Sequence, residues 1–396
     1  MMRESQQPSR KGGLQRPTSG GYPNQSLSAV DVAVNLLWCV PGAVGGSEEY
    51  LVRQLLGLAS QQSKFLPTLY VVQSFARAHP TLTALYPTVA AEITGHKRPR
   101  RLLAEHTWLS RRTRRAGIVH HGGGTTPVVG SRPILLTIHD LQYLTHPEYH
   151  SRKKLRYLRE AVPRSVNRAK IIATPTEWVR STVIEKLGAD PDRVAVIPHG
   201  IEAEIGEDAP TEVELRRNYG LGGGRVLVYP AITHPHKGHA FLLKVMSQHW
   251  DDPDLRLVLL GGAGSADRCI EAKIASLGLG RRVIRTGRVS AVHRDGLLAL
   301  AEAMVFPSEY EGFGAPLVEA MALGTPVIAA DQPAVAEVVG NAGIVLPRDS
   351  DAWATALDDV GVRRQELVAA GFRRSAEFTA ERSGAALVSA YRRVLE

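Results

Sequence analysis

Short apolar runs alternate with amphipathic stretches along the first half of the chain. The run Val32–Val40 is followed by a glycine-rich turn and then, from Ser47, by apolar residues that fall on one helical face. Later short apolar runs are typical of buried parallel strands; they are Ile134–Ile138, Ile171–Thr174 and Val194–Ile197. This alternation predicts a parallel sheet covered by helices on both faces.

A second alternating pattern follows a polar, acidic stretch after Ile201, which contains Pro210 and a glycine cluster at 220–224. We place the boundary between two domains in this stretch. The strands predicted beyond it are Val226–Tyr229, Leu257–Leu260, Val283–Thr286, Met304–Phe306 and Val327–Ala330. The pattern therefore predicts an α/β protein with two Rossmann-like, doubly wound domains, 29–205 and 206–381, that face each other across a ligand-binding cleft.

The N-terminal segment 1–28 is polar, basic and rich in Gly, Pro, Ser and Gln. It has no apolar stretch of the kind found in secretory signals, and we predict a disordered basic tail. No apolar run reaches the roughly 18 residues that cross a membrane. The two cysteines, Cys39 and Cys269, cannot make a disulfide framework or a zinc site, which favours a reducing compartment such as the cytoplasm.

The chain is basic, with 48 Lys and Arg residues against 39 Asp and Glu residues and a net charge of +9. Such a field attracts nucleotides, nucleic acids or an anionic membrane surface, although a GC-rich genome also produces many arginines. Basic residues and Trp108 concentrate in segment 97–115, a pattern typical of helices that lie on a membrane. We expect either a peripheral contact with the inner face of the cell membrane or a solvated helix face. No nucleic-acid-binding motif accompanies the charge, so we expect no nucleic-acid partner.

The strongest chemical signal lies between the strand that ends at Phe306 and a helix predicted at Ala315–Leu323. Amides without an acceptor at the start of such a helix bind anions, and the glycines of the preceding loop let a ligand approach the backbone. Glu311 before the helix and Glu319 within it can both accept hydrogen bonds from the hydroxyls of one ligand. The alternative is a helix whose glutamates are solvated.

The run Glu311–Met321, EGFGAPLVEAM, resembles the E-x7-E motif of glycosyltransferase family four, the retaining group 1 type with the two-domain GT-B fold. The resemblance covers residues 31–390. It implies that Glu311 contacts the donor sugar, that Glu319 binds the ribose hydroxyls, and that a last helix, 382–396, crosses back to the N-terminal, acceptor-binding domain. It also implies that backbone groups of the C-terminal domain hold the sugar and the diphosphate; these belong to Gly312, Phe313, Gly314, Ala315, Leu317 and Val318.

Lys237 stands in a loop between a predicted strand and a predicted helix. The resemblance implies that this lysine stabilises the departing diphosphate. The family usually has an arginine five residues earlier, where this chain has Ile232, so one phosphate contact is missing or comes from another residue. The candidates are His234, His236 and Arg288. The Pro-His-Lys sequence here looks like that of mannosyl- and rhamnosyltransferases, which favours GDP-mannose as the donor and leaves UDP- and dTDP-sugars open.

Histidines and glycines at predicted strand ends are further candidates. His139 matches a family histidine that bonds the donor sugar and positions the reacting carbon, and a structural role is the alternative. His120 and His121 point opposite ways on a strand, so at most one faces the cleft, and we assign His121 to the acceptor side. Gly45 and Gly46 resemble the first-domain loop that closes over the reaction centre.

Three Asp-x-Asp sequences match the pattern of metal-dependent transferases, but such aspartates also form caps and turns; they are Asp190–Asp192, Asp252–Asp254 and Asp349–Asp351. We expect no metal and no cofactor, because Lys237 and the helix start can serve the diphosphate. The chain is thus predicted to be a retaining, metal-independent glycosyltransferase that moves a sugar from a nucleotide-diphosphate donor to a hydroxyl of a glycan or lipid-linked acceptor. A nucleotide-sugar epimerase, a catalytically silent nucleotide-sugar-binding protein and a nucleic-acid binder are the alternatives.

Overall fold

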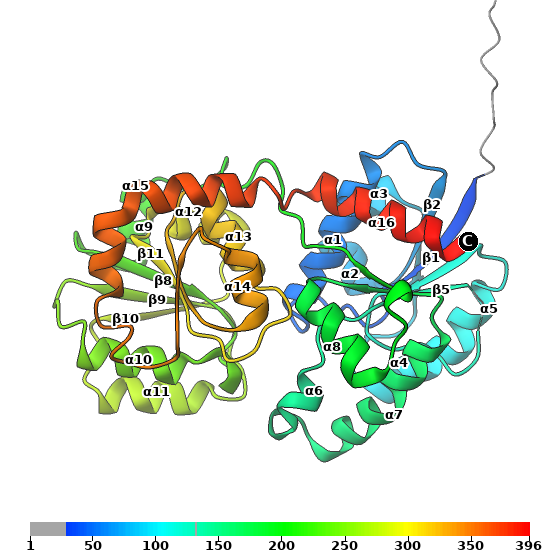
Figure 1. Cartoon of the computed structure of the whole chain (residues 1–396), viewed down its shortest axis with the longest axis horizontal. Helices are drawn as coiled ribbons and strands as arrows, with labels where there is room; N and C mark the ends of the chain where they lie inside the picture. The colour runs from blue at the N-terminus through cyan, green and yellow to red at the C-terminus, as the bar shows by residue number, and fades with distance from the viewer. Residues whose placement is uncertain (1–28, 131–132) are drawn as a thin grey trace, which may run out of the picture.

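The structure is a computed structural model that describes residues 29–130 and 133–396, and the predicted basic tail, 1–28, lies outside the described residues. The described chain forms two α/β domains that lie side by side along the long axis of the molecule (Figure 1). No helix in these two ranges is long and apolar enough to cross a membrane.

The N-terminal domain is built on a seven-stranded sheet in the order β3-β2-β1-β4-β5-β6-β7, in which all paired strands are parallel. The strands are β1 Val30–Asn35, β2 Phe65–Val72, β3 Thr88–Ala91, β4 Ile118–His121, β5 Ile134–Thr137, β6 Ile171–Thr174 and β7 Val194–Val196. The helices are α1 Gly46–Ala59, α2 Gln73–Ala78, α3 Pro80–Leu85, α4 Arg98–Ala104, η1 Glu105–Leu109, α5 Ser110–Arg112, α6 Gln142–Thr145, η2 Pro147–Tyr149, α7 Arg152–Arg168, α8 Glu177–Leu187 and η3 Pro191–Arg193.

The C-terminal domain is built on a six-stranded parallel sheet in the order β10-β9-β8-β11-β12-β13. The strands are β8 Val226–Pro230, β9 Arg256–Leu260, β10 Val283–Gly287, β11 Ala303–Phe306, β12 Val327–Ala330 and β13 Ile344–Leu346. The helices of this domain are α9 Glu212–Tyr219, η4 Pro235–Lys237, α10 His239–Gln248, α11 Asp267–Ser276, α12 Ala291–Leu300, α13 Ala315–Ala322, α14 Pro333–Val339 and α15 Ala356–Ser375, and the chain continues into a last helix, α16 Ala380–Leu395. The predicted α/β class with two doubly wound sheets is therefore confirmed.

The first predicted strand, Val32–Val40, is wrong at its carboxyl end, because β1 stops at Asn35. The Asn35 side chain accepts a hydrogen bond from the amide of Leu37 at 3.2 Å, and the Trp38 indole donates to the Asn35 carbonyl at 3.2 Å. These bonds turn the chain out of the sheet, while the apolar residues up to Val40 stay buried in the loop. The apolar run outlasts the strand because the loop itself packs into the core.

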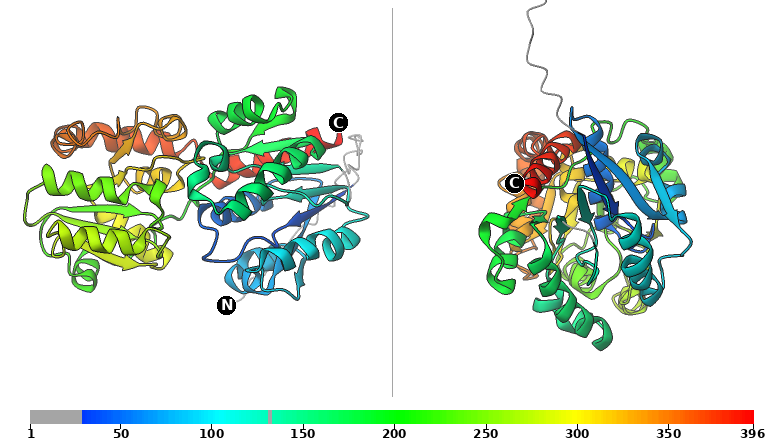
Figure 2. Two further views of the ribbon diagram at one scale, coloured as in Figure 1. Left: turned by 90° about the horizontal axis from the view of Figure 1, so that it is seen from below. Right: turned by 90° about the vertical axis from the view of Figure 1, so that its right-hand side faces the viewer.

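The chain passes between the domains twice, and the two crossings lie together. The Ile201 amide donates to the Phe378 carbonyl at 2.9 Å, and the Ala380 amide donates to the Ile201 carbonyl at 3.0 Å. From Ala380, rather than from residue 382, α16 packs along α1 of the N-terminal domain (Figure 1 and Figure 2). The last helix therefore shares the core of the N-terminal domain, although it follows the C-terminal domain in sequence.

Gly57 of α1 and Gly384 of α16 let these two helices touch at their backbones. A Cβ atom at Gly57 would lie 1.7 Å from the carbonyl oxygen of Ala380, and one at Gly384 would lie 2.2 Å from the carbonyl carbon of Gly57. We expect Gly57→Ala to push the helices apart and to lower the free energy of unfolding by about 1–3 kcal/mol, the usual cost of overpacking. Urea unfolding measures the change.

The matched control for this prediction is Gly361→Ala in α15. A Cβ atom at this exposed helical glycine meets nothing within 4 Å, so alanine should leave stability unchanged or raise it. Equal stabilities of the two variants would contradict the close contact between α1 and α16.

Candidate functional site

The carboxyl ends of the strands in the two sheets face each other, and loops from both domains touch there. A Cβ atom at Gly312 would lie 2.1 Å from the carbonyl oxygen of His139, so the backbones of these residues are in contact. The Thr176 hydroxyl, which follows β6, donates a hydrogen bond to the Gly312 carbonyl at 3.0 Å. The loop after β11 is thereby held against the ends of β5 and β6, and the domains are in contact rather than separated by an open cleft at this point.

Lys237 and Glu311 form the centre of the C-terminal side of this interface. The Lys237 ammonium nitrogen lies 2.6 Å from Glu311 Oε1, and both side chains are largely buried. The Tyr229 hydroxyl donates to the Lys237 carbonyl at 2.6 Å, and the Glu309 amide donates to the His236 carbonyl at 2.7 Å. These bonds tie η4 to the loop after β11 and so hold the ammonium beside the carboxylate. An ammonium held in this way can stabilise negative charge on a departing phosphate oxygen.

The first turn of α13 supplies backbone donors next to Glu311. In the part of the chain that the structure describes, the amides of Gly314 and Ala315 have no acceptor. The Leu317 amide, predicted to bind the diphosphate, instead donates to the Gly314 carbonyl at 2.9 Å, because it closes the first turn of the helix. Gly314 and Ala315 therefore carry the amides that suit an anion. The side chains of the other predicted donor-binding residues are buried; they are Phe313, Leu317 and Val318.

Glu319 on α13 does not face an open cleft as the sequence predicts, but lies buried between two arginines. The residue is 3% exposed, with Oε1 2.8 Å from Arg53 Nη1 and Oε2 3.6 Å from Arg294 Nε. Although burial opposes ionisation, the charges of Arg53 and Arg294 hold the pKa of Glu319 below its ordinary value. Arg53 belongs to α1 of the N-terminal domain, so this ion pair links the two domains.

Neither arginine of this network was predicted from the sequence. Each has a second carboxylate partner, since Arg53 Nε lies 2.9 Å from Glu202 Oε1 and Arg294 Nη2 lies 2.8 Å from Asp295 Oδ1. A signal was available for Arg53, which falls one turn after Tyr50 on the apolar face of α1. An arginine on a buried helix face needs a buried partner.

His139, at the end of β5, is held by the N-terminal domain. Its Nε2 lies 2.8 Å from the Gly122 carbonyl, which can only accept, so Nε2 carries the hydrogen and Nδ1 is left as an acceptor. The rings of Tyr50 and Trp38 lie 5.3 and 5.7 Å from the His139 ring. Burial lowers the pKa of His139, so the ring is neutral at neutral pH. Nδ1 can therefore accept a hydrogen bond from a sugar hydroxyl.

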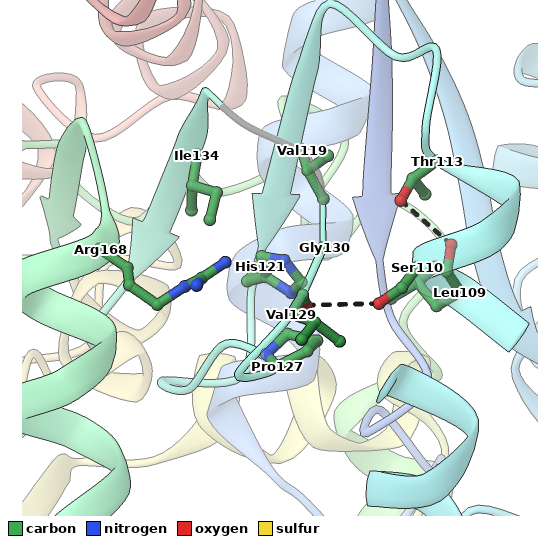
Figure 3. Close-up of a pocket in the computed structure, with 10 residues that line it drawn as sticks. All are labelled: Leu109, Ser110, Thr113, Val119, His121, Pro127, Val129, Gly130, Ile134 and Arg168. Atoms are coloured by element: carbon green, nitrogen blue, oxygen red, sulfur yellow. Dashed lines mark hydrogen bonds between the residues drawn. The ribbon is translucent and has the colours of Figure 1, made fainter. Parts of the chain in front are cut away.

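The two adjacent histidines of β4 point to opposite sides of the sheet, as predicted. Both ring nitrogens of His120 form hydrogen bonds with buried hydroxyl groups, Nδ1 with that of Tyr391 at 3.0 Å and Nε2 with that of Thr137 at 2.8 Å. His120 therefore has a structural role. His121 Nδ1 accepts from the Asn35 side-chain amide at 3.1 Å, and burial together with the Arg168 charge lowers its pKa to about 3. His121 borders a cavity with room for about one water, lined by residues of the N-terminal domain (Figure 3). The structure does not bring His121 to the interdomain contacts, so its predicted acceptor-side role has no geometric support.

The loop that carries Gly45 and Gly46 lies against the C-terminal domain. A Cβ atom at Gly42 would lie 2.6 Å from Arg288 Nη1, and one at Gly45 would lie 3.9 Å from Ile232 Cδ1. Ile232, which stands in place of the family arginine, thus lies beside this loop. The Arg288 guanidinium lies beside the same loop, whereas His236 directly precedes Lys237 in η4 and His234 precedes η4.

The three Asp-x-Asp sequences form local turns. In each, the first aspartate accepts a hydrogen bond from the amide of the second, at 2.9 Å for Asp190, 2.8 Å for Asp252 and 3.1 Å for Asp349. Within residues 29–130 and 133–396, no group of three or more His, Cys, Asp or Glu side chains is arranged to hold a metal ion. The turns are a sufficient reason for aspartate at these positions.

The basic segment 97–115 forms α4, η1 and α5 on the N-terminal domain. The Trp108 ring lies 5.9 Å from the Tyr70 ring, and the Arg112 guanidinium covers it at 4.9 Å. Trp108 therefore packs on its own domain, whereas Leu103 is exposed. A membrane contact through this segment stays a prediction.

Polar contacts that the sequence did not reveal join the domains on either side of Gly312. The Glu337 carboxylate of α14 accepts hydrogen bonds from the amides of Glu177 and Trp178 at the start of α8, at 2.8 and 2.9 Å. The Tyr149 hydroxyl donates to Glu309 at 2.6 Å. Periodicity along a single chain cannot pair residues about 160 positions apart.

Comparison with known proteins gives two family matches and a set of relatives. The family model Glycosyltransferase Family 4 matches residues 44–205, and the model Glycosyl transferases group 1 matches residues 213–366. The O-antigen chain mannosyltransferase B of Escherichia coli is 29% identical over 266 residues, which are 65% of this chain and 69% of that protein. The O-antigen chain mannosyltransferase RfbU of Salmonella typhimurium is 29% identical over 243 residues, which are 61% of this chain and 63% of that protein.

Solved structures share the architecture of this fold. The crystal structure of Anabaena HepE in complex with UDP and glucose aligns with a TM-score of 0.72 and 18% identity, over 92% of this chain and 99% of that chain. The two family models together cover most of both domains described above. The chain therefore belongs to the group 1 glycosyltransferases and has their two-domain GT-B fold.

Proposed function

We propose that the chain is a retaining, metal-independent glycosyltransferase that moves a sugar from a nucleotide-diphosphate donor to a hydroxyl of a glycan or lipid-linked acceptor, in the cytoplasm or at the inner face of the membrane. The observation that carries the proposal is the Lys237–Glu311 pair, at 2.6 Å, beside the unbonded amides of Gly314 and Ala315. A cation and two backbone donors at one helix start suit a diphosphate. In this proposal the C-terminal domain holds the donor and the N-terminal domain holds the acceptor.

In the proposed reaction the bond between the anomeric carbon and the phosphate oxygen breaks on the face where the acceptor hydroxyl arrives. The acceptor oxygen bonds to that carbon, and its proton passes to the departing phosphate oxygen. Lys237 offsets the charge that develops on this oxygen. Glu311 and Nδ1 of His139 accept hydrogen bonds from the sugar hydroxyls, and Arg288 supplies the second cation at the phosphates in place of the family arginine.

We favour GDP-mannose as the donor, supported by the Pro-His-Lys loop and by relatives that are O-antigen chain mannosyltransferases. The test is calorimetric titration of the full chain with GDP, UDP, dTDP and ADP, with and without EDTA. We expect GDP to bind most tightly and EDTA to leave its affinity unchanged. Binding of none of the four would contradict the proposal, and loss of GDP binding in EDTA would contradict metal independence. Conversion of the sugar nucleotide without any acceptor would favour the epimerase.

A further inference from the structure

Basic side chains from both domains gather next to η4 and Lys237. We name this set the basic cluster; its members are Arg98, His150, Lys154, His234 and His236. The rings of Tyr149 and His236 lie 5.6 Å apart across the interface, and His150 directly follows Tyr149 in the chain. The His234 and His236 rings stack at 5.7 Å. The Arg98 guanidinium lies 5.6 Å from the ring of Tyr157, which is one turn along α7 from Lys154.

The members of the basic cluster are close enough to disfavour one another's charged forms. Burial, and then the charge of Lys154, lowers the pKa of His150, and burial followed by Arg98 lowers that of Lys154. The effect crosses the interface, because burial, Lys237 and then Lys154 of the other domain lower the pKa of His234. Burial is the larger cause in each case, and the added repulsion shows that several basic groups lie near one another at this place.

The cations of the cluster have no direct carboxylate partner. Among the described residues, no Asp or Glu oxygen lies within the 4.0 Å ion-pair distance of Arg98 or Lys154. From beyond that distance, the charge of Asp140 favours the protonated forms of both His150 and Lys154, and the charge of Glu148 favours that of His150. In the same part of the chain, Nε2 of His150 and Nδ1 of His236 are buried without a hydrogen-bond partner. Buried nitrogens without partners carry a cost that a bound ligand with several acceptor oxygens removes.

We propose that the basic cluster binds a phosphate group of the acceptor, so that the acceptor is a phosphorylated sugar or a phosphate-bearing lipid. This inference rests on the proposed function. A phosphate monoester carries a charge of about −1.5 to −2 and three acceptor oxygens, which match two unpaired cations and imidazoles presented from both domains. An uncharged sugar would leave the excess positive charge unmatched. Three of the five members belong to the N-terminal domain, whereas the donor's diphosphate is assigned to Lys237 and α13 of the other domain.

The test is calorimetric titration of the full chain with glycerol 3-phosphate, with the protein first saturated with the nucleoside diphosphate that it binds most tightly. The nucleotide occupies the donor site, so the titration measures binding of glycerol 3-phosphate at a different phosphate site. We expect Lys154→Gln and Arg98→Gln each to weaken glycerol 3-phosphate binding roughly tenfold or more, the loss that follows removal of a hydrogen bond to a charged group. Lys153→Gln is the matched control, because Lys153 is the exposed neighbour on the same helix and loses the same charge. The affinity of Lys153→Gln for glycerol 3-phosphate should stay within twofold of that of the wild type.

A second titration separates the two sources of the phosphate. The wild-type protein is titrated with phosphatidylcholine vesicles that contain phosphatidic acid. If it binds them, and if Lys154→Gln loses this binding while Lys153→Gln keeps it, the phosphate belongs to a lipid. Binding of glycerol 3-phosphate with the same dependence, but not of the vesicles, assigns it to a soluble acceptor. Three results would overturn the inference: no phosphate binding to the nucleotide-saturated protein, equal losses in Lys153→Gln and Lys154→Gln, or a loss of nucleotide affinity alone in Lys154→Gln. Failure of every nucleotide to bind would instead count against the proposed function.

Discussion

Lys237→Ala is expected to lower the turnover number of sugar transfer about 100- to 1,000-fold, the loss found when one donor to a developing oxyanion is removed. The ammonium lies 2.6 Å from Glu311 Oε1, on the loop that leads into the first turn of α13. Because the charge on the phosphate oxygen grows as the sugar leaves, the turnover number should fall more than the affinity for the donor. Steady-state kinetics with the donor identified by calorimetry measures both quantities.

Lys244→Ala is the matched control for this variant. Lys244 is exposed on α10 of the same domain, and its removal lowers the net charge of the protein equally. It should leave the turnover number unchanged. Wild-type turnover in Lys237→Ala would show that this lysine takes no part in the reaction. An equal loss of turnover in both variants would indicate a general effect of charge.

The fold is predictable from the sequence where apolar runs are continuous and end in glycine or polar residues. The strands β8, β11 and β12 lie where the apolar runs predict them. The polar, acidic stretch after Ile201 marks the passage between the domains. The strand β2, Phe65–Val72, was missed, and it contains Pro67, a residue that argues against a central strand. The structure tolerates Pro67 because β3 pairs with β2 only from Leu69 onward, so β2 has one neighbour at the proline.

The candidate site is predictable on the C-terminal side and much less so on the N-terminal side. The spacing of Glu311 and Glu319 around a helix start is a local feature that chemistry makes conspicuous, whereas the role of Lys237 was predicted from the resemblance to the family. The partners of these residues come from the other domain, and a single sequence does not record which distant residues meet. Arg53 is the clearest case, since its ion pair with Glu319 joins α1 to α13 and is visible in the sequence only as an arginine on an apolar helix face.

The closed contact between the domains has a consequence for donor binding. Glu319 is engaged by Arg53 and Arg294, and Gly312 is in contact with His139, so a nucleotide sugar must enter while the domains are further apart or must displace these contacts. Opening and closing of this kind commonly accompanies substrate binding and product release. The ion pair between Arg53 and Glu319 then contributes to the closed form directly.

Glu319→Ala is expected to lower the free energy of unfolding by about 3–5 kcal/mol, the cost of removing one partner of a buried ion pair. The variant leaves the buried guanidinium of Arg53 and the partly exposed guanidinium of Arg294 with one carboxylate partner each. Because the second partners remain, the loss should fall at the lower end of this range. Urea unfolding at pH 7 measures it, and titration with the preferred nucleotide measures separately whether Glu319 also binds the ribose.

The pH dependence of the difference in unfolding free energy between the wild type and Glu319→Ala shows whether the Glu319 carboxylate is its source. The pKa of Glu319 lies below its ordinary value of 4.5 in the folded protein, so the carboxylate stabilises the fold above the pKa of the unfolded chain, and this contribution is lost as the pH falls through the folded value. The stability difference between the wild type and Glu319→Ala should therefore shrink below about pH 4.5. Glu366→Ala, which removes the exposed partner of Arg363, should leave stability unchanged at either pH. A Glu319→Ala variant as stable as Glu366→Ala would show that the ion pair across the interface does not hold the domains together.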